Sequence, residues 1–503
     1  MSARRRSRSL RGSLVAVLLV STCVGAAGAC TIGVASGRAT ADGRPLLWKV
    51  RDNGGVPDNE VYYNSALPMP FIAVVTANGE PGSPAWMGVN AHGFALVNAD
   101  VRDLADPLSL ANGEFMRAAL GCCRSASEFT TLLEATNGLR DTHANFGVID
   151  TTGAAVIIEA SRDEFWIYDA EDTERGFIIR TNFACADTAG AGIDGLAGAE
   201  RFIRSTDLVT AWVDAGELSH ARLAGRLARD FSNWASLPYP VPCYDCGEPD
   251  SLYGCFDTYF SICGGGSVSA AVIQGVARSP ASEPAWLTTF WVLLGQPACA
   301  VALPYWPVGP APAAADGPLT APLCDLAGQL RRQVVFHLPD RPRIVDSFAL
   351  LDGIGGGLWS ILQPAESAAL AAAGERLARW RLEPPAASTV LAFEDSLAGT
   401  VHELLSVTVS SAPPRPPTSL HLVAFPSPFN PATTFAFELP REGHVRLDVH
   451  DLAGRHVARL VDGVRAPGAQ RVPWRPVDLA SGVYVARLQA AGSVGLRRVV
   501  LVR

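Results

Sequence analysis

The chain has 503 residues and a formal net charge of −8, and 48% of its residues are apolar. This length exceeds what one hydrophobic core usually supports, so we expect at least two domains, and the apolar content excludes wholesale disorder. The acidic balance and the scattered arginines argue against a nucleic-acid partner.

Residues 1–29 read as a secretory signal peptide. Five arginines form a basic start, residues 14–20 form an apolar core, and Ala27-Gly28-Ala29 matches an A-x-A cleavage signal. Its removal would lower the net charge to −13 and leave no apolar run long enough to span a bilayer. We therefore expect a mature protein without a transmembrane segment, secreted or held at the surface of a bacterium by way of the periplasm.

Cleavage after Ala29 would make Cys30 the first residue, with a thiol and a free α-amine on the same residue. A thiol is a strong nucleophile and a terminal amine is less basic than a lysine, so the pair suits proton transfer near neutral pH. This is the chemistry of N-terminal-nucleophile (Ntn) hydrolases. Small residues before a cysteine also fit a lipidation signal, in which the amine is acylated and no base remains.

The stretch that begins at Cys30-Thr31 contains Asp42-Gly43 and then Lys49-Val50-Arg51-Asp52. It resembles the start of the choloylglycine hydrolase and penicillin acyltransferase families, whose pattern is C-T, an apolar strand, D-G and R-N-x-D. The resemblance implies that Asp52 holds the amine of the nucleophile and that Lys49 replaces an arginine beside it, while Val50 departs from the family's asparagine. Lys49 is the sole lysine of the chain; the alternative is a lysine that merely extends from a strand edge.

Three later motifs follow in the order of that resemblance. Residues 86–98 look like the family's G-x-N-x-x-G hairpin, which implies an oxyanion role for Asn98, whereas we interpret Asn90 as a turn residue. Asn182 follows Thr181 where the family carries T-N, so it is the second oxyanion candidate, with a strand cap as the alternative. Residues 200–204 resemble a helix whose first arginine, Arg201, supports the catalytic site.

These motifs predict an exported cysteine amidohydrolase or acyltransferase. Cys30 would attack the carbonyl of a small-molecule linear amide and form a thioester. Its catalytic partners would be Lys49, Asp52, Asn98, Asn182 and Arg201. No metal or organic cofactor is implied. The alternative is a non-catalytic, surface-attached binding protein or lipoprotein with a degenerate form of the same fold.

Hydrophobic periodicity predicts strands at 71–76, 93–98, 154–159, 164–168 and 176–181. Helices are predicted after the capping box Ser125-x-x-Glu128, after Ser219 with residues 223, 227 and 231 on one face, and over residues 364–381. Periodicity alone indicates mixed α and β structure. The family resemblance implies an α+β fold, a four-layer αββα Ntn-hydrolase sandwich over residues 30–409.

Nine cysteines remain besides Cys23 of the leader and Cys30, so at least one lacks a partner within the chain. Four of them cluster in a segment rich in Tyr, Gly and Pro, namely Cys243, Cys246, Cys255 and Cys263. An exported protein would form disulfides there, and zinc binding by the four thiols is the alternative. The adjacent Cys122 and Cys123 do not easily bridge each other.

Residues 410–419 form a Pro-rich linker, and residues 420–503 carry short strands separated by turns. This tail resembles the immunoglobulin-like C-terminal domains of secreted bacterial proteins, similar to the sorting domains of the type IX secretion route. The resemblance implies a small C-terminal β-sandwich without catalytic residues. It also implies that export and C-terminal sorting machinery are partners of the chain.

Overall fold

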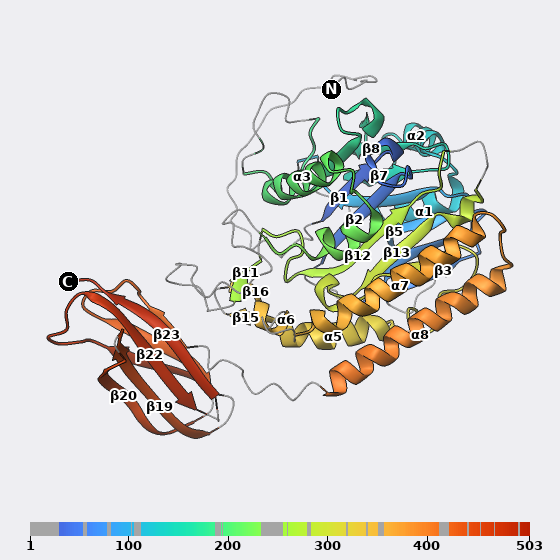
Figure 1. Ribbon diagram of the computed structural model, residues 1–503. Helices are drawn as coiled ribbons and strands as arrows, with labels where there is room; N and C mark the ends of the chain where they lie inside the picture. The colour runs from blue at the N-terminus through green and yellow to red at the C-terminus, as the bar shows by residue number, and fades with distance from the viewer. Residues whose placement is uncertain are drawn as a thin grey trace, which may run out of the picture. The chain divides into compact units, whose positions relative to one another are not determined.

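The computed structural model in Figure 1 describes a defined part of the chain. The described residues are 30–53, 58–77, 82–101, 103–104, 112–186, 193, 195–232, 255–258, 260–278, 283–317, 320–338, 341–350, 357–411, 422–439, 442–452, 454–466, 468–490 and 493–503. The predicted signal peptide lies outside them. The chain forms two compact units, one of Met1–Tyr239, Asp257–Ile344 and Ala349–Val407, the other of Pro240–Phe256, Val345–Phe348 and Thr408–Arg503.

Two antiparallel sheets form the centre of the first unit. The six-stranded sheet has the order β10-β1-β2-β12-β13-β14, and the seven-stranded sheet runs from β3 to β9 in chain order. The strands of the first sheet are β10 (Phe177–Arg180), β1 (Thr31–Ala35), β2 (Leu46–Asp52), β12 (Ser267–Gln274), β13 (Thr289–Leu294) and β14 (Leu303–Tyr305). Those of the second are β3 (Asn59–Asn64), β4 (Phe71–Thr76), β5 (Ala85–Asn90), β6 (Ala95–Asp100), β7 (Ala144–Ile149), β8 (Ala155–Ala160) and β9 (Phe165–Asp169).

The two sheets lie face to face, with β1 and β2 of the first packed on β6 and β7 of the second. Gly147 permits this close approach. A Cβ atom at Gly147 would lie 2.7 Å from Leu47 Cδ1, so a larger residue there would require the Leu47 side chain to move. The candidate residues Cys30, Lys49 and Asn98 belong to this part of the molecule. Cys30 precedes β1, Lys49 lies on β2 and Asn98 lies on β6.

Helices flank the sheets. The α-helices are α1 (Asn112–Cys122), α2 (Ala126–Ala135), α3 (Ala199–Asp214), α4 (His220–Gly225), α5 (Pro322–Val334), α6 (Ser347–Leu350), α7 (Trp359–Trp380) and α8 (Ala387–Ser411). Short 3-10 turns are η1 (Gly37–Ala39), η2 (Ala170–Asp172), η3 (Leu227–Arg229), η4 (Ala285–Leu287) and η5 (Pro297–Cys299). No helix in the described ranges is both long enough and apolar enough to cross a bilayer.

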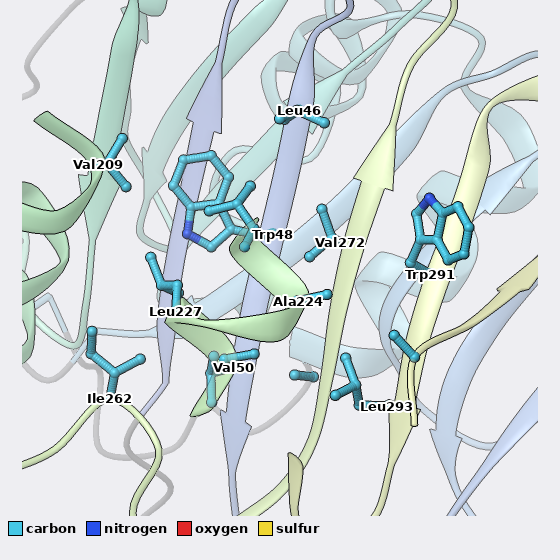
Figure 2. Packing of buried hydrophobic residues seen from close by; sticks show 14 of the residues in the cluster. Leu46, Trp48, Val50, Val209, Ala224, Leu227, Ile262, Val272, Trp291 and Leu293 are labelled. Carbon is cyan, nitrogen blue, oxygen red and sulfur yellow. The ribbon is translucent and has the colours of Figure 1, made fainter. Parts of the chain in front are cut away.

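Separate apolar clusters join helices to the outer face of each sheet. Phe129 of α2 and Leu120 of α1 are buried against Phe146 and other residues of the seven-stranded sheet. On the six-stranded sheet, Trp48 lies against residues of α3, α4 and η3, as Figure 2 shows. The first unit is therefore mixed α+β, with helices outside two antiparallel sheets, as the αββα prediction requires.

Most predicted elements are present within one or two residues of their expected bounds, and two differ. Ser125 caps α2 by accepting a hydrogen bond from the Glu128 amide at 3.2 Å, which confirms the predicted helix start. The Glu128 side chain accepts from the Arg124 amide at 2.7 Å, one residue before the donor of a full capping box. The helix after Ser219 ends at Gly225, earlier than predicted, and η3 follows, although Leu227 and Phe231 are still buried. The late helix begins at Trp359 instead of Pro364.

The second unit contains two further sheets around one apolar core. Their orders are β17-β18-β21 and β20-β19-β22-β23, and the core includes Phe435, Leu447 and Trp474. The bounds are β17 (Val423–Phe425), β18 (Thr433–Leu439), β19 (Gly443–Asp451), β20 (His456–Arg465), β21 (Gly468–Trp474), β22 (Gly482–Ala490) and β23 (Ser493–Leu501).

A separate small sheet has the order β11 (Cys255–Asp257), β16 (Arg341–Asp346) and β15 (Val335–Leu338).

The predicted linker at 410–419 begins inside a helix, because α8 continues to Ser411. The remainder of that segment lies outside the described residues.

Candidate active site

Cys30 directly precedes β1 and is buried, with 7% of its surface exposed. Within the sheet, Ile32 pairs with Arg180 of β10 on one side and with Lys49 of β2 on the other. Extending this antiparallel register by two residues places Cys30 beside Asn182 and Arg51. The strand order thus brings two other parts of the sequence to the candidate nucleophile.

Arg201 of α3 connects Cys30 to Asn182. One terminal nitrogen of its guanidinium donates to the Cys30 carbonyl oxygen at 2.6 Å and to Thr31 Oγ1 at 3.1 Å, and the other donates to Asn182 Oδ1 at 2.8 Å. Asn182 Nδ2 in turn donates to the Asp100 carbonyl oxygen at 2.8 Å. The guanidinium therefore orients both the backbone of Cys30 and the amide of Asn182.

Gly198 makes room for this guanidinium at the start of α3. Its φ of +86° is in the left-handed region, and a Cβ atom there would lie 2.4 Å from Arg201 Nη2. Both the backbone conformation and the close approach require glycine. Glycine at the start of α3 therefore allows the Arg201 guanidinium to occupy this position.

Lys49 is buried, and its ammonium is held by two acceptors. Nζ donates to Asn98 Oδ1 at 2.7 Å and to the Trp86 carbonyl oxygen at 3.0 Å. Burial lowers the pKa of Lys49 to about 8, and the charge of Arg51 lowers it too, whereas negative charge on Cys30, Asp100 and Asp52 raises it. Lys49 therefore bonds to Asn98 and lies close enough to Cys30 to interact with its charge.

This lowered pKa predicts a pH-dependent contribution to stability. Between about pH 8 and 10.5 the unfolded chain binds a proton on Lys49 that the folded chain lacks, so stability rises with pH across that window. We expect the wild type to gain up to about 3 kcal/mol in free energy of unfolding over Lys49→Met between pH 7 and pH 10.5. Urea denaturation of both proteins across that range measures the gain, and a constant difference would contradict the buried, titrating lysine.

Asp52 ends β2 and accepts a hydrogen bond from Ser267 Oγ at 2.5 Å. Its charge raises the pKa of both Lys49 and Arg51, which places it in the same electrostatic group. Ser267 was not among the predicted residues. It begins β12, the strand that pairs with β2 on the side away from Cys30.

Arg51 is a residue that the sequence motifs did not single out. Its guanidinium donates to Asn59 Oδ1 at 2.5 Å and to Thr76 Oγ1 at 3.3 Å, and its Cζ lies 4.8 Å from the centre of the Trp86 ring. Burial lowers its pKa to about 10, and negative charge on Cys30 opposes that shift. A second basic residue in the short strand that also holds Lys49 was the available signal, because such charges are buried only where they have partners.

Asn90 has the structural role that we expected for it. Nδ2 donates to the carbonyl oxygens of Leu120 and Cys123, and Oδ1 accepts from the amides of His92 and Phe94. These bonds join the end of α1 to the turn between β5 and β6. Asn98, by contrast, bonds to Lys49 at the other end of β6.

The cysteine cluster is only partly visible, because Cys243 and Cys246 lie outside the described residues, and so does the side chain of Cys255. Cys263 is a buried free thiol that donates to Gln296 Oε1 at 3.2 Å. Cys122 is exposed and Cys123 is buried, and their sulfur atoms lie 3.7 Å apart. The described part of the chain contains no group of three or more His, Cys, Asp or Glu side chains that could hold a metal ion.

No model of a protein family matches this chain, and no curated protein matches it. Among solved structures, two variants of conjugated bile acid hydrolase from Clostridium perfringens are similar to it, each with a TM-score of 0.32. Their sequence identities are 11% and 12%, and the matches cover 53% and 52% of this chain and 89% of each of theirs. At this identity and TM-score, the similarity does not assign the chain to a family.

Proposed function

We propose that this chain is an exported cysteine amidohydrolase or acyltransferase that cleaves a linear amide through Cys30. The observation that supports it best is the Arg201 guanidinium, which joins the Cys30 carbonyl to the side chain of Asn182. This contact unites the first residue of the expected mature chain with an oxyanion candidate 152 positions later in the sequence.

In the proposed reaction, the thiol sulfur of Cys30 attacks the carbonyl carbon of the amide. The α-amine of the same residue takes the thiol proton and delivers it to the leaving nitrogen, so that the C–N bond breaks and a thioester remains. Water then attacks the thioester and yields an acid, or an acceptor amine attacks it and yields a new amide. Either attack breaks the C–S bond and releases the thiol, and the α-amine passes the proton of the attacking water or amine to the sulfur, so Cys30 returns to its starting state; no cofactor takes part.

The two asparagines and two buried cations support the negative charge that develops on the carbonyl oxygen. Lys49 bonds to the oxygen end of Asn98, and Arg201 bonds to the oxygen end of Asn182. Because each cation binds the amide oxygen, the hydrogen-bond network fixes which end of each amide is the N–H donor. Donors oriented before the reaction stabilise an oxyanion without further reorganisation.

The state of the first residue tests the proposal directly. We expect the exported protein to begin with an unmodified Cys30, because the proposed base is its α-amine. Intact mass and N-terminal sequencing of protein from the culture medium or cell surface measure this. A mature start at another residue, or a diacylglycerol adduct on Cys30, would remove the base and favour the lipoprotein alternative.

The asparagines make a second test. We expect Asn98→Ala and Asn182→Ala each to lower kcat about 100-fold or more with little change in KM, because the lost donor acts on the oxyanion. The matched control is Asn90→Ala, which should lower the free energy of unfolding by about 1–3 kcal/mol and leave kcat almost unchanged. A kinetic loss confined to Asn90→Ala would show that the wrong end of the β5–β6 hairpin has been assigned.

We also propose that residues 420–503 direct the chain to the cell surface or medium. The support is the pattern of short strands and turns in the sequence together with the two small sheets of the second unit. None of the residues proposed for chemistry lies in that unit.

A further inference from the structure

A groove of about 670 Å³ runs along β10, the edge strand of the six-stranded sheet. β9, the edge strand of the seven-stranded sheet, and α3 form its other walls. The wall residues include four aromatic side chains, Trp166, Tyr168, Phe177 and Phe202. This volume and lining are typical of pockets that bind small organic ligands.

Arg180 is the charged side chain at the buried end of the groove, whereas Glu174 and Arg175 are exposed. Its Nε donates to Glu159 Oε1 at 2.6 Å, and its Cζ lies 4.7 Å from the centre of the Tyr168 ring. Glu159 also accepts from the amides of Cys185 and Ala186, so it fixes the guanidinium in one orientation. Burial raises the pKa of Tyr168 and of Cys185, which keeps both of these groups uncharged at neutral pH.

The guanidinium retains hydrogen-bonding capacity on the groove side. Nε bonds to Glu159 and Nη1 donates to the Ile179 carbonyl oxygen at 2.9 Å. Nη2 makes no hydrogen bond to the described residues. An anionic acceptor fits this nitrogen, because charge-assisted bonds to a guanidinium are among the stronger hydrogen bonds in proteins.

The edge of β10 is protected against pairing with another strand. Gly176 bonds toward β1, so the alternation of an antiparallel strand turns the carbonyls of Phe177 and Ile179 outward. Thr173 Oγ1 donates to the first of these at 3.3 Å, and Arg180 occupies the second. An extended peptide would find both acceptors in use, so a small amphiphile suits the groove better.

The groove adjoins the candidate active site through one turn of the chain. Arg180 and Cys185 line the groove, and Asn182 lies between them in sequence. On α3, Phe202 lines the groove and its neighbour Arg201 bonds to the Cys30 carbonyl. The groove and the candidate site therefore share the segment 180–185 and the start of α3, although Cys30 itself is not among the lining residues.

We propose that this groove binds one arm of the amide substrate, an aromatic or long-chain body that carries a carboxylate, with the carboxylate on Arg180. The inference rests on the proposed function for the reaction itself, but binding in the groove is measurable without turnover. The aromatic side chains of the groove contact the apolar part of the ligand, and Nη2 of Arg180 donates a hydrogen bond to its carboxylate.

The experiment uses the full-length mature chain with Cys30→Ala, which cannot turn over. Calorimetry compares 4-phenylbutyrate, the neutral 4-phenylbutyramide and the cationic 4-phenylbutylamine. We expect the carboxylate to bind at least about tenfold more tightly than the amide, and the cation to bind most weakly. Arg180→Lys keeps the charge beside Glu159 but loses the planar fork, so it should reduce this preference.

Two tryptophan substitutions on α3 form a matched pair of variants. Thr206→Trp fills the groove and should abolish binding, whereas Asp207→Trp on the exposed side of the same helix should leave it unchanged. Equal affinity for all three probes, or unchanged binding in a folded Thr206→Trp protein, would overturn the inference. Binding that follows these expectations in a protein whose Cys30 form cleaves no amide would refute the proposed function and leave the groove standing.

Discussion

Replacing Cys30 with alanine is expected to reduce amide cleavage to the uncatalysed background. The reaction would lose its only proposed nucleophile, and a loss on the order of 10⁶-fold is typical when a covalent nucleophile is removed. The fold should be retained, because the bond from Arg201 goes to the backbone carbonyl of residue 30, which alanine keeps. The measurements are turnover of an amide panel, circular dichroism, and labelling with iodoacetamide followed by peptide mass analysis.

The control for this result is Cys122→Ala, which removes an exposed thiol from the end of α1. We expect it to lower iodoacetamide uptake without any change in turnover. Undiminished cleavage by the Cys30→Ala protein would move the nucleophile elsewhere. Loss of activity in both variants would indicate that oxidation or misfolding, and not the loss of a nucleophile, explains the result.

A large loss of stability is expected from Arg229→Met. Arg229 is buried in the turn after α4, and its two terminal nitrogens donate to Glu366 Oε1 at 2.7 Å and Oε2 at 2.5 Å on α7. Removing the arginine leaves a buried carboxylate without its partner, which costs about 3–5 kcal/mol. Such a loss is a large part of the 5–15 kcal/mol that stabilises a typical domain.

The matched control is Arg175→Met, which breaks an exposed pair whose atoms, Arg175 Nε and Asp214 Oδ1, are 2.9 Å apart. Both side chains are about half exposed and the pair is screened by solvent, so this variant should leave the free energy of unfolding almost unchanged. Chemical denaturation followed by tryptophan fluorescence compares the two. Similar losses in both variants would show that the buried pair between η3 and α7 contributes no more to stability than the exposed pair.

The local capping signal predicted the start of α2, whereas apolar spacing did not predict the end of the helix after Ser219. Ser125 and Glu128 mark the start of α2 because their hydrogen bonds lie within four residues. The helix after Ser219 was predicted too long because the apolar spacing of residues 223, 227 and 231 reports burial, and these residues are buried whether or not the helix continues. Gly225 ends the helix, and η3 then keeps the apolar side chains on the core.

For the candidate site, the sequence motifs predicted the residues but not the contacts between them. Cys30, Asn182 and Arg201 are distant in sequence, and the β1–β10 pairing and the start of α3 bring them together. Arg51 was missed because it stands at the variable position x of the R-N-x-D pattern, and only the β1–β2 register reveals that it lies beside Cys30. The Arg229–Glu366 pair could not be predicted from the sequence either, because 137 residues separate its members.

The burial of the sole lysine makes the protein unusually simple toward amine-reactive reagents. With Lys49 1% and Cys30 7% exposed, a folded chain that begins at Cys30 offers such reagents no accessible amine. An N-hydroxysuccinimide ester should therefore leave that chain almost unlabelled until it unfolds, when both the α-amine and Lys49 react. Counting labels by mass would report when the core of the protein opens.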